Sequence, residues 1–332
     1  MKLPCPHICN SIVAGAITLF TVDAFAQKPE VERQYPTKPI RLIVPFVPGG
    51  TTDIIARVIA NKAPVYLGQP LVIDNRGAEG GVVGAEMLAR AAPDGYTLGV
   101  ATVSTIATAP AMRREMPYKP TEDFTPIINI AATPNVLLVH PSFPARDYSA
   151  FIAQVRKRPS EHYSYASSGH GGLGHMLMAL FQSKTGTSLL HVPFTGGGPA
   201  LSNVAGGHVH LMIANLPSAL PFIKDKRLVP IAVAGDDRIA AMLEVPTFEQ
   251  LHLPEVNRLA FYGFCGPKGL PRQIVQTLHA AVKRTLADPQ VLQAIANTGS
   301  VVIGNSPAEF GRQIRTEFEI YKAVVDIQKL RR

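Results

Sequence analysis

The sequence predicts an α/β protein of two lobes with a ligand cleft between them. The chain has 332 residues, a length at which two domains are more common than one. Short β-branched segments alternate with segments of helical period, which is typical of parallel sheets covered by helices. The 27 glycines and 29 prolines show no Gly-X-Y repeat, so they indicate many junctions between strands and helices.

Composition excludes several classes of protein. Hydrophobic residues make up 46% of the chain and charged residues only 17%, which excludes a disordered protein. After residue 26, Gly, Pro or charge interrupts every apolar stretch before it reaches the roughly 18 residues of a membrane-spanning helix. The net charge is +8, but Lys and Arg are scattered, so we expect no nucleic-acid partner.

The first 26 residues have the pattern of a secretory signal peptide. Lys2 supplies the positive start, residues 8–22 are mostly apolar, and Ala24-Phe25-Ala26 forms a cleavage site of small residues. A short membrane anchor is the alternative. We expect cleavage after Ala26, a periplasmic protein, and a polar tether over residues 27–34. The removed segment carries one Lys and one Asp, so the net charge stays at +8.

The cysteines divide between the two parts of the chain. Cleavage removes Cys5 and Cys9, and Cys265 is then the only thiol, so no intramolecular disulfide is possible. Neither removed cysteine follows the small apolar residues of a lipoprotein signal, so we expect no lipid anchor.

The expected elements alternate along the chain in two sets. The first set has strands at 40–44, 71–73 and 96–101, with helices at 53–65 and 82–91. The second set has strands at 135–140, 163–166, 189–192, 211–213 and 229–234, with helices at 149–155, 175–183 and 217–223. From residue 271 onward the pattern is mostly helical, with helix starts at Pro271, Pro289 and Pro307. Ligands bind such sheets at the carboxyl ends of strands.

Three junctions share a strand end, paired glycines and a helix start. They are residues 45–53, 166–175 and 193–199. Glycine allows a close backbone approach, and the amides and positive dipole end of the following helix favour an anion. Ordinary capped helix starts are the alternative. Between residues 163 and 223 the only charged residue is Lys184, so a ligand there must be held by amides, hydroxyls and water.

Two motifs point to other chemistry. Residues 169–174 fit G-x-G-x-x-G after a strand, but residues 189–198 hold no acidic residue to bind a ribose, so a nucleotide is disfavoured. His208 and His210, expected on one face of a strand, could bind a metal with His175 or His191. A solvent-facing or hydrogen-bonded pair is favoured, because no Cys or carboxylate cluster accompanies them.

No enzyme motif stands out. G-x-S-x-G, Walker and H-E-x-x-H sequences are absent from the chain. Cys265 with a distant His could form a nucleophilic pair, but residues 264–267 have the pattern of a packed crossover. We therefore expect no enzyme, no metal and no cofactor.

Several long motifs, in order, resemble the substrate-binding proteins of tripartite tricarboxylate transporters, also called Bug proteins. The resemblance runs from about Tyr35 to the C-terminus. The motifs on which it is based are residues 35–41, 44–53, 75–81, 93–98, 165–169, 191–194 and 215–221.

The resemblance implies a periplasmic-binding-protein-like fold of the Venus flytrap type, whose two lobes close over a small carboxylate. It implies delivery to a membrane transporter, or else presentation to a membrane sensor. We expect a monomer, with residues 35–134 and 262–332 in lobe 1 and residues 135–261 in lobe 2. Carried over by position, the ligand-binding residues are Phe46, Gly49, Gly50, Thr51, Thr52, Asp53, Thr102, Ser104, Thr105, Ser167, Ser168, Gly169, His170 and His191.

The chain departs from the family pattern at three positions. Ala179, Asn203 and Ala214 stand where, or close to where, members commonly carry acidic residues. If at least one of them faces the cleft, the loss suggests a ligand that is more anionic, or carries fewer amino groups, than a dicarboxylic amino acid.

Overall fold

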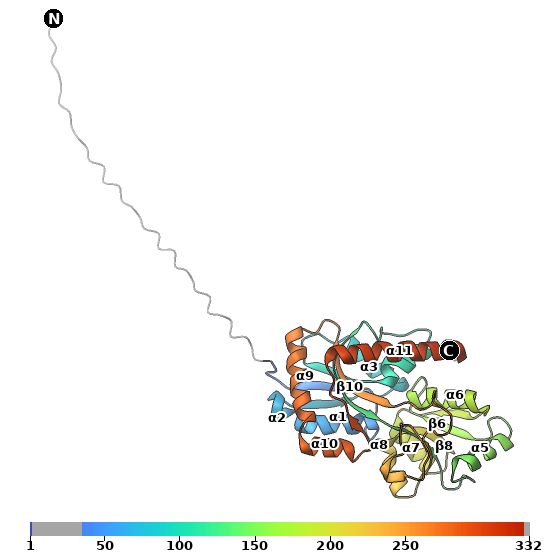
Figure 1. Ribbon diagram of the computed structural model, residues 1–332. Coiled ribbons are helices and arrows are strands. Elements are labelled where there is room, and N and C mark those ends of the chain that lie inside the picture. Colours follow the sequence, from blue (N-terminus) through green and yellow to red (C-terminus); the bar gives the residue numbers. More distant parts are fainter. Residues whose placement is uncertain (2–34, 329–332) are drawn as a thin grey trace. The chain divides into compact units, whose positions relative to one another are not determined.

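The computed structural model describes residues 35–328 together with Met1. The expected signal peptide and tether lie outside these residues. Residues 35–328 form one compact unit. Within its described part the strands form two sheets, of six and five strands, each covered by helices (Figure 1).

The first sheet has the strand order β11-β4-β10-β3-β1-β2. Strands β1, β2 and β3 run parallel, whereas β10 is antiparallel to β3 and β4, and β11 is antiparallel to β4. Helices α3 and α11 lie over one face, and α1 and α10 over the other (Figure 1). The strands are β1 (Ile40–Val44), β2 (Leu71–Asn75), β3 (Thr97–Thr102), β4 (Phe124–Thr133), β10 (Ala260–Pro267) and β11 (Val301–Val302).

The helical segments that belong with this sheet come from both ends of the chain. From the first part they are α1 (Thr51–Lys62), α2 (Pro64–Leu67), η1 (Glu79–Gly81), α3 (Val82–Ala89), η2 (Ser104–Thr108) and α4 (Ala109–Met112). From the last part they are α9 (Arg272–Leu286), α10 (Pro289–Ala296) and α11 (Pro307–Gln328). The helix starts expected at Pro271, Pro289 and Pro307 are confirmed, because Pro271 is the N-cap of α9 and the other two prolines begin their helices.

The second sheet has the strand order β7-β6-β8-β5-β9. Its strands are β5 (Asn135–Val139), β6 (Ser164–Ser167), β7 (Leu190–Pro193), β8 (Leu211–Asn215) and β9 (Val229–Val233). Its helices are α5 (Tyr148–Lys157), α6 (Leu173–Thr185), α7 (Gly197–Ala205) and α8 (Leu216–Lys224), and a short turn η3 (Ala240–Met242) follows β9.

Successive side chains of β5 point alternately to the two faces of this sheet. Leu137 and Val139 belong to the core that includes α5 and α6, through residues such as Phe151 and Phe181. Val136 and Leu138 point the other way, into a core built with α7 and α8. Helices therefore cover both faces, which is the layered arrangement that the sequence predicts.

The chain passes from the first sheet to the second at Pro134. This residue lies between β4 and β5 and has no N–H to donate, so the ladder ends there. The chain returns between β9 and β10. Strands β4 and β10 were not expected from the sequence, and residues 264–267 form the end of β10 and not a crossover.

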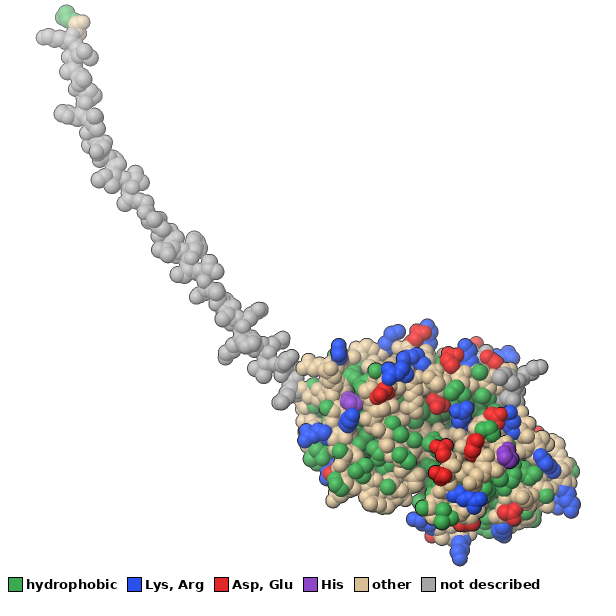
Figure 2. Space-filling model, in the orientation of Figure 1, with side chains coloured by type: hydrophobic (Ala, Val, Ile, Leu, Met, Phe, Trp, Pro, Cys, Tyr) green, Lys and Arg blue, Asp and Glu red, His purple; other side chains and the backbone are tan. Residues whose placement is uncertain are grey.

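The surface agrees with the scattered charge of the sequence. On the face shown in Figure 2, Lys and Arg side chains are interspersed with Asp and Glu. Among the described residues, no helix combines the length and apolarity needed to cross a membrane.

Candidate functional site

A cavity lies where the two sheets face each other. Its volume is about 50 Å³, enough for a few water molecules at the roughly 10–15 Å³ that each requires. None of the described residues that line it is Asp, Glu, Lys, Arg or His. Its polar wall includes Thr51, Thr52, Thr102, Ser104, Asn135, Ser168, Asn215, Ser218 and Tyr262; its other residues include Phe46, Gly50, Leu173, Gly174, Gly197, Met212, Ala214 and Ala260.

Four helix N-termini meet at this cavity. Lining residues come from the first turns of α1, α6, α7 and α8, for example Thr51, Leu173, Gly197 and Ser218. The N-cap side chain accepts no hydrogen bond from the first turn in any of these four helices, all of which lie in the described part of the chain. Each N-terminus favours an anion by about 0.3–1 kcal/mol, and by up to about 2 kcal/mol when partly buried. The site can therefore attract an anion without a cationic side chain.

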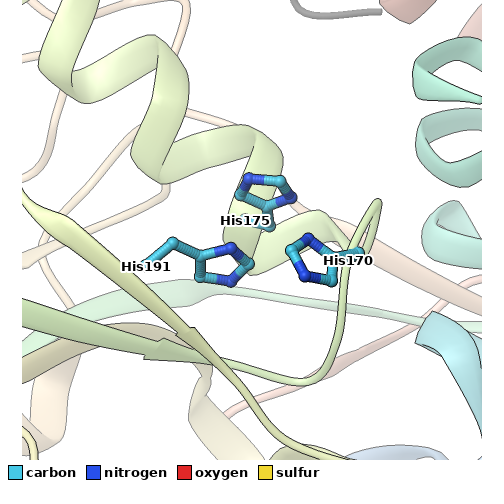
Figure 3. A group of neighbouring side chains, drawn as sticks. All are labelled: His170, His175 and His191. Carbon is cyan, nitrogen blue, oxygen red and sulfur yellow. The ribbon is translucent and has the colours of Figure 1, made fainter. Parts of the chain in front are cut away.

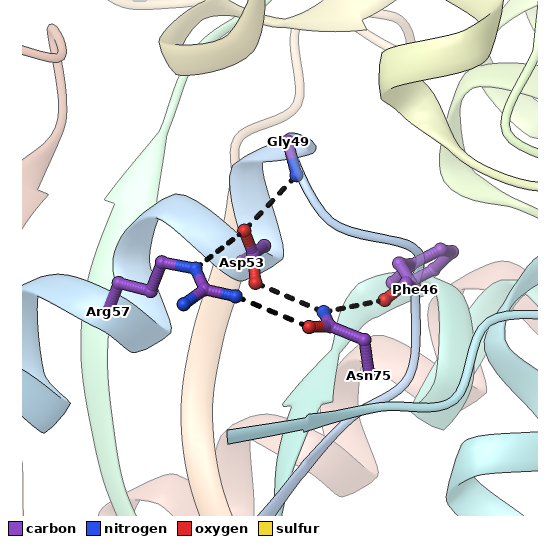
Figure 4. A network of polar contacts seen from close by, with 5 residues as sticks. All are labelled: Phe46, Gly49, Asp53, Arg57 and Asn75. Carbon is purple, nitrogen blue, oxygen red and sulfur yellow. Dashed lines mark hydrogen bonds and ion pairs between the residues drawn. The ribbon is translucent and has the colours of Figure 1, made fainter. Parts of the chain in front are cut away.

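The loop that carries Phe46 and Gly50 is held by Asp53 (Figure 4). The Asp53 carboxylate accepts hydrogen bonds from Gly49 N at 3.1 Å, Arg57 Nε at 2.9 Å and Asn75 Nδ2 at 3.0 Å. Asn75 Nδ2 also donates to the Phe46 carbonyl at 3.0 Å. The carboxylate is thus directed to its own loop, which it keeps in the shape that lines the cavity.

The charge on Asp53 is stabilised by the same contacts. Burial by itself would raise the pKa of this carboxyl group. The hydrogen bonds from Arg57, Gly49 and Asn75, together with the charge of Arg57, outweigh burial and hold the pKa below its ordinary value. Asp53 is therefore ionised at neutral pH.

Direct hydrogen bonds join the two sides of the cavity. The Thr51 hydroxyl donates to Ser218 Oγ at 3.0 Å, and Ser218 N donates back to Thr51 Oγ1 at 3.2 Å. Leu173 N donates to Ser104 Oγ at 3.0 Å. The two sides of the cavity are therefore in direct contact, with little space between them.

Asn135 connects the places where the chain changes sheets. Its Nδ2 donates to the Arg258 carbonyl at 2.6 Å, just before β10, and its Oδ1 accepts from Asn215 Nδ2 at 2.7 Å. The residue is 1% exposed and lines the cavity. A polar side chain so deeply buried needs these partners, and through them it ties both crossover segments to the site.

The predicted site residues fall into two groups. Those that line the cavity are Phe46, Gly50, Thr51, Thr52, Thr102, Ser104 and Ser168. Those that do not line it are Gly49, Asp53, Thr105, Ser167, Gly169, His170 and His191.

Several predicted residues that do not line the cavity form hydrogen bonds that position residues that do. The Thr105 hydroxyl is hydrogen-bonded to Thr102, with Thr102 N donating to Thr105 Oγ1 at 3.1 Å. Gly169 N donates to Ser167 Oγ, and Ser167 Oγ lies 2.6 Å from His191 Nε2. These contacts fix the loop that presents Ser168.

Sequence reasoning omitted several lining residues. Asn135 and Tyr262 were missed because they lie at the start of β5 and within β10, and only the fold brings these strands to the cavity. Asn215 and Ser218 belong to a motif that carried the family resemblance, so the signal was present. Burial raises the pKa of the Tyr262 phenol, which keeps its proton available for donation.

Two glycines, one from a predicted junction and one from η1, bring the two sides of the cavity together. A Cβ atom on Gly169 would lie 2.7 Å from Gly80 N, and one on Gly80 would lie 2.8 Å from the His170 carbonyl oxygen. Both glycines also have positive φ angles, +124° and +70°. The G-x-G-x-x-G segment therefore packs against η1, a role that needs no nucleotide.

The other candidate chemical groups lie away from the cavity. Cys265 is buried, and burial raises the pKa of its thiol, which disfavours a thiolate nucleophile. His210 accepts a hydrogen bond from Ser164 N at 3.0 Å, and His208 is exposed, as expected for the pair. Both lie just before β8 and not on a strand.

Of the three departures from the family pattern, only Ala214 lines the cavity. Asn203 Nδ2 instead donates to the Pro199 carbonyl within α7 at 3.0 Å. Ala214 is therefore the departure on which the ligand hypothesis rests.

Comparisons with known proteins agree with this architecture. Residues 55–330 match the model of the tripartite tricarboxylate transporter family receptor. Protein BugT of Bordetella pertussis is 34% identical over 312 residues, covering 94% of this chain and 95% of BugT.

Two solved structures are similar throughout. Rpa4515 of R. palustris, determined with adipate, is 34% identical with a TM-score of 0.85, covering 89% of this chain and 98% of its own. MatC of Rhodopseudomonas palustris, determined with bound malate, is 31% identical with a TM-score of 0.84, covering 88% of this chain and 100% of its own. The chain therefore belongs to the tripartite tricarboxylate transporter receptor family, which includes the Bug proteins.

Proposed function

We propose that this protein is a periplasmic receptor that captures a small carboxylate between its two lobes and delivers it to a tripartite tricarboxylate-type transporter. The observation that carries the proposal is the meeting of four helix N-termini at a cavity whose described lining residues carry no charged side chain. Amides and hydroxyls arranged in this way suit a carboxylate, which accepts several hydrogen bonds at once. The adipate and malate bound by two relatives are ligands of this class.

In this proposal the ligand contacts Thr51, Thr52, Thr102, Ser104 and Ser168, with Asn135 and Ser218 completing the wall. Gly49, Asp53, Thr105, Ser167 and Gly169 hold the loops. The first 26 residues direct export and are cleaved after Ala26, and residues 135–261 move as lobe 2 against the rest. The protein acts as a monomer and not as an enzyme.

The cavity is small because the lobes meet directly, so a ligand enters when they separate. The contacts between Thr51 and Ser218 and between Ser104 and Leu173 are then exchanged for contacts to the ligand. Closure over the ligand changes the surface that the protein presents to its membrane partner. Ala214 lines the cavity close to where members commonly carry an acidic residue, which leaves the site open to ligands of higher negative charge.

Thermal unfolding with a panel of mono-, di- and tricarboxylates, including adipate and malate, tests the proposal. A ligand present at about 100 times its Kd should stabilise the protein by about 2.7 kcal/mol. The matched comparison is each dicarboxylate against its uncharged diamide of equal length, which should give no shift. Stabilisation by the diamides to the same extent, or by no member of the panel, would refute carboxylate capture.

A pair of serine variants tests the location of the site. Ser168→Ala should weaken binding by about three- to tenfold, because one hydrogen bond contributes about 1 kcal/mol. Ser202→Ala makes the same change on the exposed surface of α7 and should leave the affinity unchanged. Equal affinities in isothermal titration would place the ligand elsewhere.

A second function, presentation of the filled receptor to a membrane sensor, uses the same site. The two differ in the partner, so uptake of the labelled ligand by cells that lack this protein separates them. Loss of uptake supports transport, and unchanged uptake supports sensing.

A further inference from the structure

Three histidines outside the cavity lie together in the second-sheet part of the protein (Figure 3). His170 is on the loop after β6, His175 is in the first turn of α6, and His191 is on β7. One side-chain nitrogen of each lies within 4.8 Å of the others. The fold therefore brings three imidazoles from three separate segments around one point.

The packing fixes these rings from several sides. Tyr165 and His191 are register partners on the parallel strands β6 and β7, and their rings stack at 4.8 Å between centroids. The His191 and His175 rings stack at 4.0 Å with an interplanar angle of 13°. His170 is exposed and lies edge-on to His191, with centroids 4.9 Å apart.

We propose that His170, His175 and His191 form a binding site for a late first-row divalent metal ion, with Zn²⁺ the foremost candidate. Neutral imidazole is a preferred ligand of this class of ion, and three imidazoles with one open position are a recurrent zinc arrangement. Ligand nitrogens around tetrahedral zinc lie closer together than in the present arrangement, so the three rings draw together when the ion binds.

The stacked pair must also open slightly. A metal lies near the plane of each imidazole that binds it, and two parallel rings cannot both satisfy this condition. The χ2 torsion of histidine has a broad energy well, so a small rotation of His175 or His191 stays within it. His170 is exposed on its loop and can turn toward the other two rings.

Neighbouring groups set which ring nitrogen carries the lone pair in two of the ligands. His191 Nε2 lies 2.6 Å from Ser167 Oγ, and His175 Nδ1 accepts from Gly171 N at 3.2 Å, so an ion bound by His175 replaces that hydrogen bond at Nδ1. When the Ser167 hydroxyl donates to the Gly169 carbonyl, His191 Nε2 donates to Ser167 and its Nδ1 carries the lone pair. A partner that accepts from the second ring N–H, as Ser167 does for His191, is a regular part of histidine metal sites.

A second cavity adjoins the histidine cluster. This cavity has a volume of about 550 Å³, and His170 and His175 line it together with Met112, Arg113, Arg114, Glu115 and Gly171. Arg113 is paired with Glu79 at 2.7 Å. The two arginines and the N-terminus of α6 oppose a bare cation, but they favour an anion as the fourth ligand, such as hydroxide, chloride or a carboxylate. The dipole contribution is small beside three metal–nitrogen bonds.

Metal uptake by the purified protein, produced without a histidine tag and treated with chelator, tests the proposal. Equilibrium dialysis against Zn²⁺ followed by elemental analysis should show about one tightly held ion per chain. Co²⁺ should give the intense visible absorption of a four-coordinate site. His170→Ala, His175→Gln and His191→Gln should each abolish the absorption and the stoichiometric Zn²⁺.

His208→Ala is the matched control, because it removes an exposed histidine outside the cluster and should change neither readout. His170→Ala keeps the test informative if the variants of the more buried rings fail to fold. Absence of stoichiometric uptake, or uptake equal in the native protein and His170→Ala, would overturn the proposal and leave the three rings as aromatic packing. Carboxylate binding is measured separately, so the two proposals can fail independently.

Discussion

Asp53 shows how one acidic residue serves a site that it does not line. Its sequence position, at the start of a helix after paired glycines, resembles that of a ligand contact. Its carboxylate is instead occupied by Gly49, Arg57 and Asn75. The negative charge stays beside the loop and away from a cavity that we expect to receive an anion.

Asp53→Asn should lower the free energy of unfolding at neutral pH by about 1–3 kcal/mol, because charge-assisted hydrogen bonds are lost. The pKa of Asp53 is lower in the folded than in the unfolded state. Its contribution is therefore complete above the unfolded pKa of about 3.9 and disappears as the pH falls through the folded pKa. Urea unfolding should show that Asp53→Asn differs from the native protein less in free energy of unfolding at about pH 3 than at about pH 7.

The exposed Asp236→Asn is the control for this experiment and should have little effect at either pH. A loss from Asp53→Asn that is equal at both pH values would show that its charge is not the cause.

Gly80 illustrates a second role that a residue type alone does not reveal. A side chain there would meet the His170 carbonyl across the interface, whereas Gly68, with a similar φ of +72°, has nothing within 4 Å of its Cβ position. Gly80→Ala and Gly68→Ala should both destabilise by about 1–2 kcal/mol, through the left-handed backbone.

Only Gly80→Ala should also weaken binding of the tightest carboxylate of the panel, because it hinders closure. Calorimetric titration of both variants decides this. Equal affinities would mean that the close approach at Gly80 is not needed in the bound state.

At the scale of elements, the first turns of four helices form much of the wall of the cavity. The beginnings of α1 and α8 are joined through Thr51 and Ser218, far apart in the sequence. The variants Thr51→Val and Ser218→Ala, alone and together, should show a coupling of about 0.5–1.5 kcal/mol in unfolding experiments.

Thr125→Val provides the matched control for this cycle. Thr125 donates to the Pro267 carbonyl within the first sheet. Its effect should add to that of Ser218→Ala within about 0.3–0.5 kcal/mol. Additivity of Thr51→Val with Ser218→Ala would contradict an energetic link between the two helices.

The elements also show what sequence can predict here. Strands such as β1 and β5 and the proline-initiated helices could be predicted, because β-branched runs and Pro at a helix start are local signals. Strands β4 and β10 could not, since Pro126, Gly263 and Gly266 interrupt their patterns and long-range pairing with each other compensates.

The site was predictable to the extent that it is made of junctions. Phe46 and Ser168 lie between a strand and a helix, and Thr51 begins a helix, so their place was visible in the sequence. Asn135 and Tyr262 lie on β5 and β10, the strands that follow the two changes of sheet, and the histidine cluster depends on the register of β6 with β7. Tertiary pairing of this kind leaves no mark in a single sequence.

At the scale of the whole molecule, the positive charge and the cavity are separate features. Lys and Arg give a net charge of +8 and are spread over the surface, whereas no described residue that lines the cavity carries a full charge. Long-range attraction and final recognition are therefore performed by different groups.

Because the surface charge and the cavity are separate, the association rate and the dissociation rate should respond differently to salt. Added salt should slow association of a dicarboxylate, because it screens the surface field over a Debye length of about 10 Å at 0.1 M. Dissociation should hardly respond, since no ion pair at the cavity has to break. Stopped-flow measurements at low and high ionic strength test this, and a salt-dependent dissociation rate would contradict it. Such a receptor fills at a rate that depends on its medium and empties at a rate that depends only on its own opening.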